Sequence, residues 1–135
     1  MKVYDLIIIG AGPAGLSAGI YAGRAKLDTL IIEKAQAGGQ ILQTSEIENY
    51  PGSVPEESGA SLISRMDEQT KKFGIEKVID IVKAVSLDGK IKTVTCDGGE
   101  YQAKTIIIAG GVTARSIDCG GEDEFLGRGV SRCGT

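Results

Sequence analysis

The sequence predicts an α/β fold with a doubly wound, mostly parallel sheet and a small antiparallel β-meander. Three apolar runs rich in isoleucine predict it, at residues 3–9, 29–33 and 105–109. Runs of this kind are typical of strands buried on both faces of a parallel sheet. A glycine-rich turn and a segment with helical spacing lie between the first two runs, as a crossover connection requires.

The first half of the chain gives a strand at 3–9, a helix at 14–25 and a strand at 29–33. Together they form one β-α-β unit of about 30 residues. Residues 46–59 contain Pro51 and Pro55 and predict an irregular loop, and long loops of this kind are usually functional. A helix is expected over 61–73, ended by Gly74.

The second half predicts the meander and then a return to the sheet. Residues 77–87 and 90–96 read as alternating strands joined at Asp88-Gly89, a strong hairpin signal. A turn at 97–99 leads to a strand at 100–103, and the buried strand at 105–109 should return beside the first strand. After Arg115 the chain has no clear periodicity and is expected to form a linker.

Composition excludes several classes of function. The chain has 135 residues, a net charge of -3 and no long basic run, which argues against nucleic-acid binding. Its apolar runs are far shorter than the roughly 20 residues of a membrane span, and no secretory signal is visible, so we expect a cytoplasmic protein without membrane contact. With no histidine, and with Cys96, Cys119 and Cys133 widely spaced, no metal site is predicted. Cys96 and Cys119 are interpreted as structural.

The glycine pattern predicts dinucleotide binding. Gly10 permits a tight turn, Gly12 lets a pyrophosphate approach the backbone, and Gly15 allows close helix–strand packing. Glu33 ends the second strand, 18 residues beyond Gly15, where a carboxylate accepts hydrogen bonds from ribose. Because a carboxylate repels a 2′-phosphate, FAD or NAD suits this site better than NADP. A glycine turn alone can be only a turn, but the strand–turn–helix context favours the binding interpretation.

Further motifs occur in a fixed order along the whole chain. With the glycine turn, the sequence contains Gly38-Gly39-Gln40, Glu48-Asn49-Tyr50-Pro51-Gly52, Ile108-Ala109-Gly110-Gly111, Gly129-Val130-Ser131 and Cys133-Gly134-Thr135. In this combination the sequence resembles the bacterial thioredoxin reductases, the low-molecular-weight FAD-dependent pyridine nucleotide-disulfide oxidoreductases.

The resemblance implies the N-terminal portion of a homodimeric thioredoxin-disulfide reductase. Residues 1–113 would be part of a Rossmann-like FAD-binding domain, and residues 114–135 a linker and the start of an NADPH and disulfide domain. Electrons would pass from NADPH to FAD, then to a Cys-x-x-Cys disulfide, then to thioredoxin. Cys133 matches the first, catalytic cysteine of that pair, whose partner would follow Thr135, and the NADPH site would lie beyond this chain.

The resemblance also assigns the residues that would hold FAD. The glycine turn and Glu33 would bind pyrophosphate and ribose, Ile81 or Val82 would meet the adenine through backbone groups, and Ala109 with Gly111 would close the site. The full set is Gly10, Gly12, Pro13, Ala14, Gly15, Glu33, Lys34, Gly38, Gly39, Gln40, Leu42, Asn49, Ile81, Val82, Ala109 and Gly111.

The sequence departs from the family pattern at Gly110, Arg132 and Gly134, where the family usually has Thr, Tyr or a similar residue, and Ala. Three alternatives stay open. A ferredoxin-NADP reductase of the same build usually lacks the cysteine pair, so Cys133 argues against it. A flavin thioredoxin reductase that draws electrons from ferredoxin, and a non-catalytic flavin-binding fragment, also fit. The chain alone is not expected to turn over.

Overall fold

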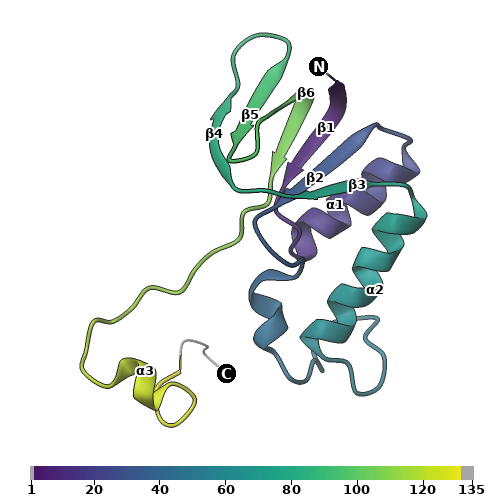
Figure 1. Cartoon of the computed structure of the whole chain (residues 1–135). Helices are drawn as coiled ribbons and strands as arrows, with labels where there is room; N and C mark the ends of the chain where they lie inside the picture. The colour runs from purple at the N-terminus through teal and green to yellow at the C-terminus, as the bar shows by residue number, and fades with distance from the viewer. Residues whose placement is uncertain (1, 132–135) are drawn as a thin grey trace.

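A six-stranded mixed sheet organises the chain, with strand order β3-β2-β1-β6-β5-β4 (Figure 1). This computed structural model describes residues 2–131. The central strand β1 (Val3–Ile9) lies between β2 (Thr29–Glu33) and β6 (Glu100–Ile108), and it pairs in parallel with both. β3 (Glu76–Ile79) adds a fourth parallel strand outside β2. The predicted parallel sheet is therefore confirmed, with its apolar strands at 3–9 and 29–33, while the third apolar run forms the second half of β6.

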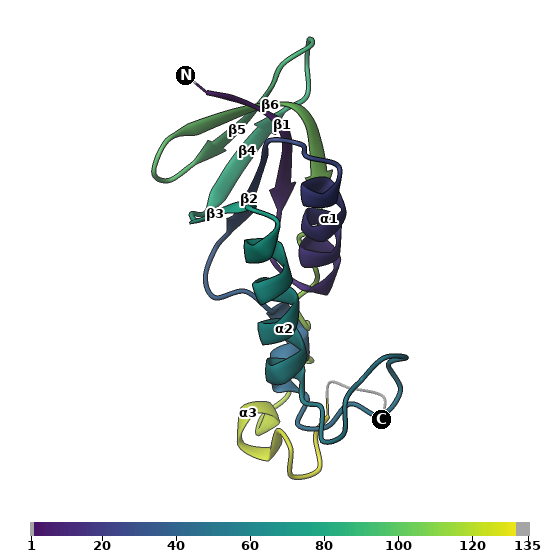
Figure 2. The same ribbon diagram turned by 90° about the vertical axis from the view of Figure 1, so that its right-hand side faces the viewer.

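Two helices, α1 (Pro13–Arg24) and α2 (Gly59–Lys72), cover one face of the parallel strands (Figure 2). Alternate residues of β1 and β2 point into this layer, because successive side chains of a strand face opposite ways. Gly19 of α1 packs tightly against both neighbours, since a Cβ there would lie 2.9 Å from Ile31 of β2 and 3.4 Å from Thr70 of α2. The cluster between the layers includes Leu6, Ile8, Leu16, Ile31, Leu62, Ile63 and Met66.

The antiparallel meander covers the opposite face. It consists of β4 (Val82–Ser86), β5 (Lys92–Cys96) and the first half of β6. Its side chains meet those of β1 and β2 in a second cluster formed by Tyr4, Ile7, Leu30, Ile32, Val94, Cys96 and Ala103. Both faces of β1 are thus buried, which is why its sequence reads as a continuous apolar run instead of an alternating one.

The structure corrects the predicted strand at 77–87, which is two strands. β3 and β4 lie at opposite edges of the sheet, and only Asp80 and Ile81 connect them. The Asp80 side chain accepts hydrogen bonds from the N–H groups of Ile81 and Gly98, at 2.8 and 3.1 Å, and so fixes the crossing. The alternating pattern runs through this point, so periodicity alone could not reveal the break.

A second correction concerns the strands predicted at 100–103 and 105–109, which form the single strand β6. Its first residues pair antiparallel with β5, whereas Gln102–Ile108 run parallel to β1. The expected burial of its far end is wrong, because Ile107 is 41% and Ile108 68% exposed. Pairing with β5 stops at Ala103, and from there to Ile108 the strand pairs with β1 alone among the described strands.

Helix α2 begins at Gly59, two residues before the predicted start, because Ser58 and Ser61 form a reciprocal capping box. Two short helices were not predicted, the 3-10 helix η1 (Gly39–Gln43) and α3 (Glu122–Phe125). α3 lies apart from the sheet, at the end of the segment that follows β6 (Figure 1). Within residues 2–131, no helix is long and apolar enough to span a membrane.

Candidate dinucleotide-binding site

The glycine turn lies at the carboxyl end of β1, where the strand order changes direction. From β1 the chain continues through α1 to β2 on one side, while β6 returns on the other. Ligands of open α/β sheets bind in the crevice at such a switch point. The fold therefore places the sequence-predicted motif where a ligand crevice forms.

Two of the three motif glycines are required by packing. Gly10 has a φ of 104°, and a Cβ there would overlap the carbonyl oxygen of Ala109. A Cβ on Gly15 would overlap the carbonyl oxygen of Gly10. These positions confirm the tight turn and the close helix–strand packing that the sequence predicted.

Gly12 has a different reason for lacking a side chain. Its φ of -75° suits any residue, and a Cβ there would meet only the Gly38 carbonyl, at 3.7 Å. A Cβ on Gly39 would come no closer than 4.0 Å to the Cα of Gly12. A methyl group at either glycine would make only ordinary van der Waals contacts, so packing within the chain does not require them. We call the turn around Gly12 and Gly39 the cradle.

The N-terminus of α1 faces this cradle without a side-chain cap. The first intrahelical bond runs from the N–H of Leu16 to the carbonyl of Gly12 at 2.9 Å, so the N–H groups of Ala14 and Gly15 precede the ladder. Pro13 has no N–H to satisfy, and the first turn holds no acidic residue. Unpaired N–H groups and the positive end of the helix dipole favour an anion such as a pyrophosphate.

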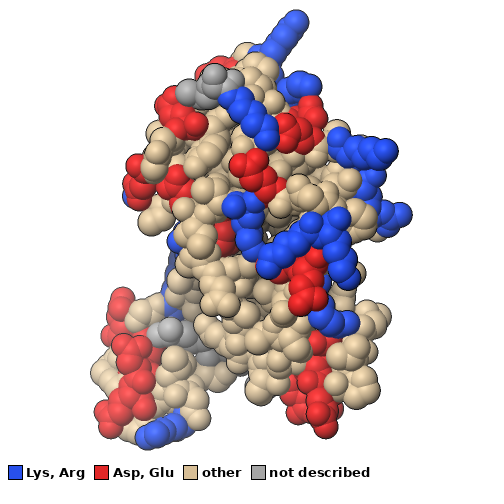
Figure 3. Space-filling view, turned by 45° about the vertical axis from the view of Figure 1, so that its right-hand side comes forward, with Lys and Arg blue, Asp and Glu red and all other residues tan. Residues whose placement is uncertain are grey.

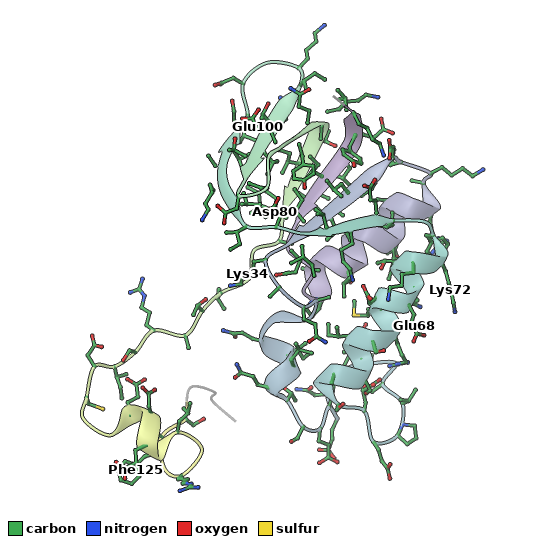
Figure 4. The ribbon with its side chains drawn as sticks, in the orientation of Figure 1. Lys34, Glu68, Lys72, Asp80, Glu100 and Phe125 are labelled. Atoms are coloured by element: carbon green, nitrogen blue, oxygen red, sulfur yellow. The ribbon has the colours of Figure 1, made fainter. Side chains whose placement is uncertain are left out.

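Glu33 stands beside the turn, at the end of β2. Its Oε2 accepts a hydrogen bond from the N–H of Ala11 at 2.6 Å, and its Oε1 accepts one from Lys34 at 2.8 Å. Each carboxylate oxygen has further acceptor capacity, which ribose hydroxyls can use. The Lys34 side chain, labelled in Figure 4, extends from this end of the sheet.

The Gly38-Gly39 segment is tied directly to the turn. The N–H of Gly38 donates to the carbonyl of Ala11 at 2.9 Å, and its φ of 136° favours glycine. The Leu42 side chain packs where a Cβ of Gly38 would lie. From η1, the Gln40 side chain donates to the carbonyl of Val112 at 2.9 Å, so the segment that contains Gly111 passes η1.

A cleft of about 810 Å³ adjoins the N-terminus of α1. Pro13, Ala14 and Asn49, three of the predicted residues, line it together with Ser17. Its remaining walls come from η1, the following loop and α2: Ile41, Thr44, Glu46, Ile47, Glu48, Tyr50, Leu62 and Met66. The cleft has the size of ordinary ligand sites, so the structure brings two separate sequence motifs to one cavity.

Ile81 and Val82 lie at the crossing between β3 and β4, near Asp80 in Figure 4. The N–H of Asp80 donates to the carbonyl of Glu33 at 2.9 Å, which places this crossing beside the ribose candidate. The N–H and carbonyl of Ile81 both have protein partners, and Val82 packs against the second core cluster. A backbone contact from Ile81 to a base would use the second lone pair of its carbonyl.

Comparison with known proteins decides the family. A family model for the pyridine nucleotide-disulphide oxidoreductases matches residues 4–135. The chain belongs to this family. Among curated relatives, the chain is 54% identical over 134 residues to the thioredoxin reductase of Peptoclostridium acidaminophilum, covering 99% of the chain and 42% of the relative. The thioredoxin reductase of Aquifex aeolicus is 52% identical over 134 residues, covering 98% of the chain and 42% of the relative.

Solved structures agree with this family assignment. Thioredoxin reductase from Streptococcus pyogenes superimposes with a TM-score of 0.84 at 41% identity, covering 91% of this chain and 40% of that protein. A ferredoxin-flavin thioredoxin reductase from Clostridium acetobutylicum gives 0.77 at 36% identity, covering 96% and 44%. The chain spans well under half the length of the relatives it matches.

The catalytic candidate Cys133 lies outside the described residues. Of the other two thiols, Cys96 is buried in the second core cluster, where burial raises its pKa, with Asp80 and Asp97 adding to the effect. This placement confirms the structural interpretation of Cys96. Cys119 is exposed, so its thiol does not take part in a core.

Sequence reasoning missed three residues that shape the site. Ser17 lines the cleft one helical turn after Pro13, a spacing that the sequence already showed. Ile47 is buried in the first core cluster. It therefore holds the loop between η1 and α2, residues 44–58, against the core, and we call this segment the cleft loop. Glu57 is almost fully buried in the same loop, for which the sequence carries no signal.

Proposed function

We propose that this chain is the FAD-binding portion of a thioredoxin-disulfide reductase. The observation that carries the proposal is the cradle at Gly12, where packing does not require a glycine, beside an uncapped helix N-terminus and the Glu33 carboxylate. This donor set fits a dinucleotide whose ribose carries a free 2′-hydroxyl. The thioredoxin reductase names of the relatives support FAD as that dinucleotide.

In this proposal the chain binds, orients and partly encloses the cofactor. The N–H groups of Ala14 and Gly15 hold the pyrophosphate, and Glu33 holds the adenosine ribose. Pro13, Ala14 and Asn49 line the cleft that receives the flavin. The remaining proposed contacts to the cofactor are Lys34, Gly38, Gly39, Gln40, Leu42, Ile81, Val82, Ala109 and Gly111. FAD, when bound, supplies the redox chemistry that links a pyridine nucleotide to a disulfide.

The proposal extends to the parts of the reaction that the described residues do not contain. NADPH is the electron donor at a site outside this chain, thioredoxin is the partner, and the complete enzyme is a cytoplasmic homodimer. Residues 1–113 belong to the FAD domain, and residues 114–135 lead into the NADPH and disulfide domain. The Cys133 thiolate attacks a disulfide sulfur of thioredoxin, forming a mixed disulfide and releasing the other sulfur as a thiolate.

Two measurements test these statements separately. Titration of the purified chain with FAD, followed by quenching of flavin fluorescence, should show saturable binding, with NADP binding much more weakly. Reduced chain mixed with oxidised thioredoxin should give a mixed disulfide by intact mass. The adduct should disappear in Cys133→Ser and persist in Cys119→Ser, whereas an adduct that follows Cys119 would contradict the assignment.

A second candidate is a reductase whose donor is ferredoxin. The structural likeness to the ferredoxin-flavin enzyme motivates it, although the TM-score of 0.77 is lower than the 0.84 for the thioredoxin reductase from Streptococcus pyogenes. Flavin-loaded protein that includes the proposed NADPH domain, offered NADPH and reduced ferredoxin in separate anaerobic cuvettes, distinguishes the two. Bleaching of the flavin band by NADPH alone supports our proposal, and bleaching by ferredoxin alone supports the second candidate.

A further inference from the structure

Glu57 is a carboxylate in an unusual place for a surface loop. It is only 1% exposed, and its side chain is fully covered. Its Oε1 accepts a hydrogen bond from the Ser61 hydroxyl, and its Oε2 accepts from the Arg65 guanidinium and, at 3.4 Å, from the N–H of Val54. Every partner comes from the cleft loop or from α2.

The backbone of the same residue holds the other half of the loop. The N–H of Ile47 donates to the carbonyl of Glu57 at 2.7 Å, and next to it the N–H of Gly59 donates to the carbonyl of Thr44 at 2.9 Å. These two bonds close the neck of the loop. Residues 46–50, which line the cleft, emerge directly from this neck.

A simpler role for Glu57 would be to start helix α2, but the helix does not need it. Ser58 and Ser61 already cap one another, at 2.9 and 3.1 Å between backbone nitrogen and hydroxyl oxygen. Burying a carboxylate is costly unless it is fully paired. A glutamate side chain without a structural role would therefore be expected to point to solvent. Its neighbour Glu56 is indeed exposed.

We infer that Glu57 is a positioning residue, which joins the cleft wall 46–50 to α2 and thereby sets the place of Asn49 at the flavin. Its side chain holds the C-terminal half of the loop to Ser61 and Arg65 of α2. Its backbone carbonyl accepts the hydrogen bond from Ile47, so the N-terminal half of the loop is held as well. This inference rests on the proposed FAD site, but its first half concerns the chain alone and can be tested without flavin.

The test compares Glu57→Ala and Glu57→Gln with matched changes at the exposed Glu56. Gln keeps an oxygen for Arg65 and Val54, while its amide can donate to the Ser61 hydroxyl, which then donates to the Ser58 carbonyl at 3.1 Å. Glu57→Gln should therefore retain most of the FAD affinity and most of the protection of residues 46–50 from amide exchange. Two readouts are taken, amide hydrogen exchange of residues 46–50 in flavin-free protein and FAD affinity by fluorescence.

We expect Glu57→Ala to speed exchange at Ile47 and to weaken FAD binding about tenfold, while exchange in β1 and β2 stays slow. Glu56→Ala and Glu56→Gln should change neither quantity. Arg65→Ala, which leaves the helix cap intact, should reproduce the effect of Glu57→Ala and add little to it in the double variant.

The outcomes test the anchoring of the loop and the proposed flavin site separately. If Glu57→Ala speeds exchange but leaves FAD affinity unchanged, the loop is only structural and the inference is overturned. Unchanged exchange overturns it too, whatever happens to FAD. If the original chain binds no FAD, the proposed function fails, and the positioning role at the flavin fails with it. The exchange data then still show whether Glu57 holds the loop to α2.

Discussion

The Glu33 carboxylate accepts a hydrogen bond from the backbone N–H of Ala11 at 2.6 Å, which joins the end of β2 to the turn that follows β1. The same carboxylate accepts the N–H of Lys34 at 2.8 Å. Glu33 therefore shapes the turn through its own hydrogen bonds as well as offering acceptors to a ribose. A residue that the spacing rule assigns to the ligand also holds together the loop that would receive it.

The first prediction concerns this double role. In Glu33→Gln the amide must face at least one backbone N–H, so one hydrogen bond is lost. We expect the free energy of unfolding to fall by about 1 kcal/mol and FAD affinity to fall about tenfold. Discrimination against NADP should decrease, since the repelling charge is gone. Urea unfolding and flavin titration measure these quantities, with Glu68→Gln on α2 (Figure 4) as the control.

The second prediction contrasts two glycines of one motif. Gly15→Ala places a methyl group into the Gly10 carbonyl and should cost about 1–3 kcal/mol of stability. Gly12→Ala has an ordinary φ and only one contact at 3.7 Å, so stability should change little while FAD binding weakens. Equal loss of stability in both variants, measured by urea unfolding, would contradict the distinction between packing and cradle.

The amino-acid sequence predicted the parallel part of this fold well, because strands buried on both faces are continuous apolar runs. The runs at 3–9 and 29–33 match β1 and β2 in full, and the Asp88-Gly89 hairpin is where it was expected. What failed depends on tertiary contacts. The break at Asp80 is held by a hydrogen bond to its side chain from Gly98, which is distant in sequence. Ile108 is exposed at the end of β6, where the pairing with β5 has already stopped.

The candidate site divides in the same way. The glycine turn and Glu33 could be found from spacing, because short loops between a strand and a helix have few solutions. Asn49 came from resemblance alone, and the cleft shows it beside Pro13 and Ala14. Glu57 could not be found, since a glutamate in a loop with two prolines carries no sign of burial.

The third prediction concerns acid stability. Burial disfavours the charged form of Asp67, but hydrogen bonds from Lys77 and Lys71 outweigh it and hold the pKa of Asp67 below its usual value. On the face of the molecule shown in Figure 3, acidic and basic side chains lie next to one another. Because the folded pKa is depressed, this stability is present above the unfolded pKa of about 3.9 and is lost as pH falls through the folded pKa.

Asp67→Asn should therefore lose stability at neutral pH and show a shallower decline on acidification than the original chain. Thermal unfolding measured from pH 7 down to about pH 2.5 tests this. Glu68→Gln, on the same helix, is the matched control and should keep the original slope. Parallel curves for Asp67→Asn and the original chain would exclude the ion pairs with Lys77 and Lys71 as the cause.

The fourth prediction separates the two described thiols. The thiolate is the reactive form of cysteine, and burial raises the pKa of Cys96, with Asp80 and Asp97 adding to it. Cys96 also lies between β-strands in the second core cluster, whereas Cys119 is exposed. With iodoacetamide at pH 8, Cys119 should react on the order of 100-fold faster than Cys96 by peptide mass mapping. In denaturant the two rates should converge, and fast labelling of Cys96 in the folded chain would show that the meander opens readily from β1 and β2.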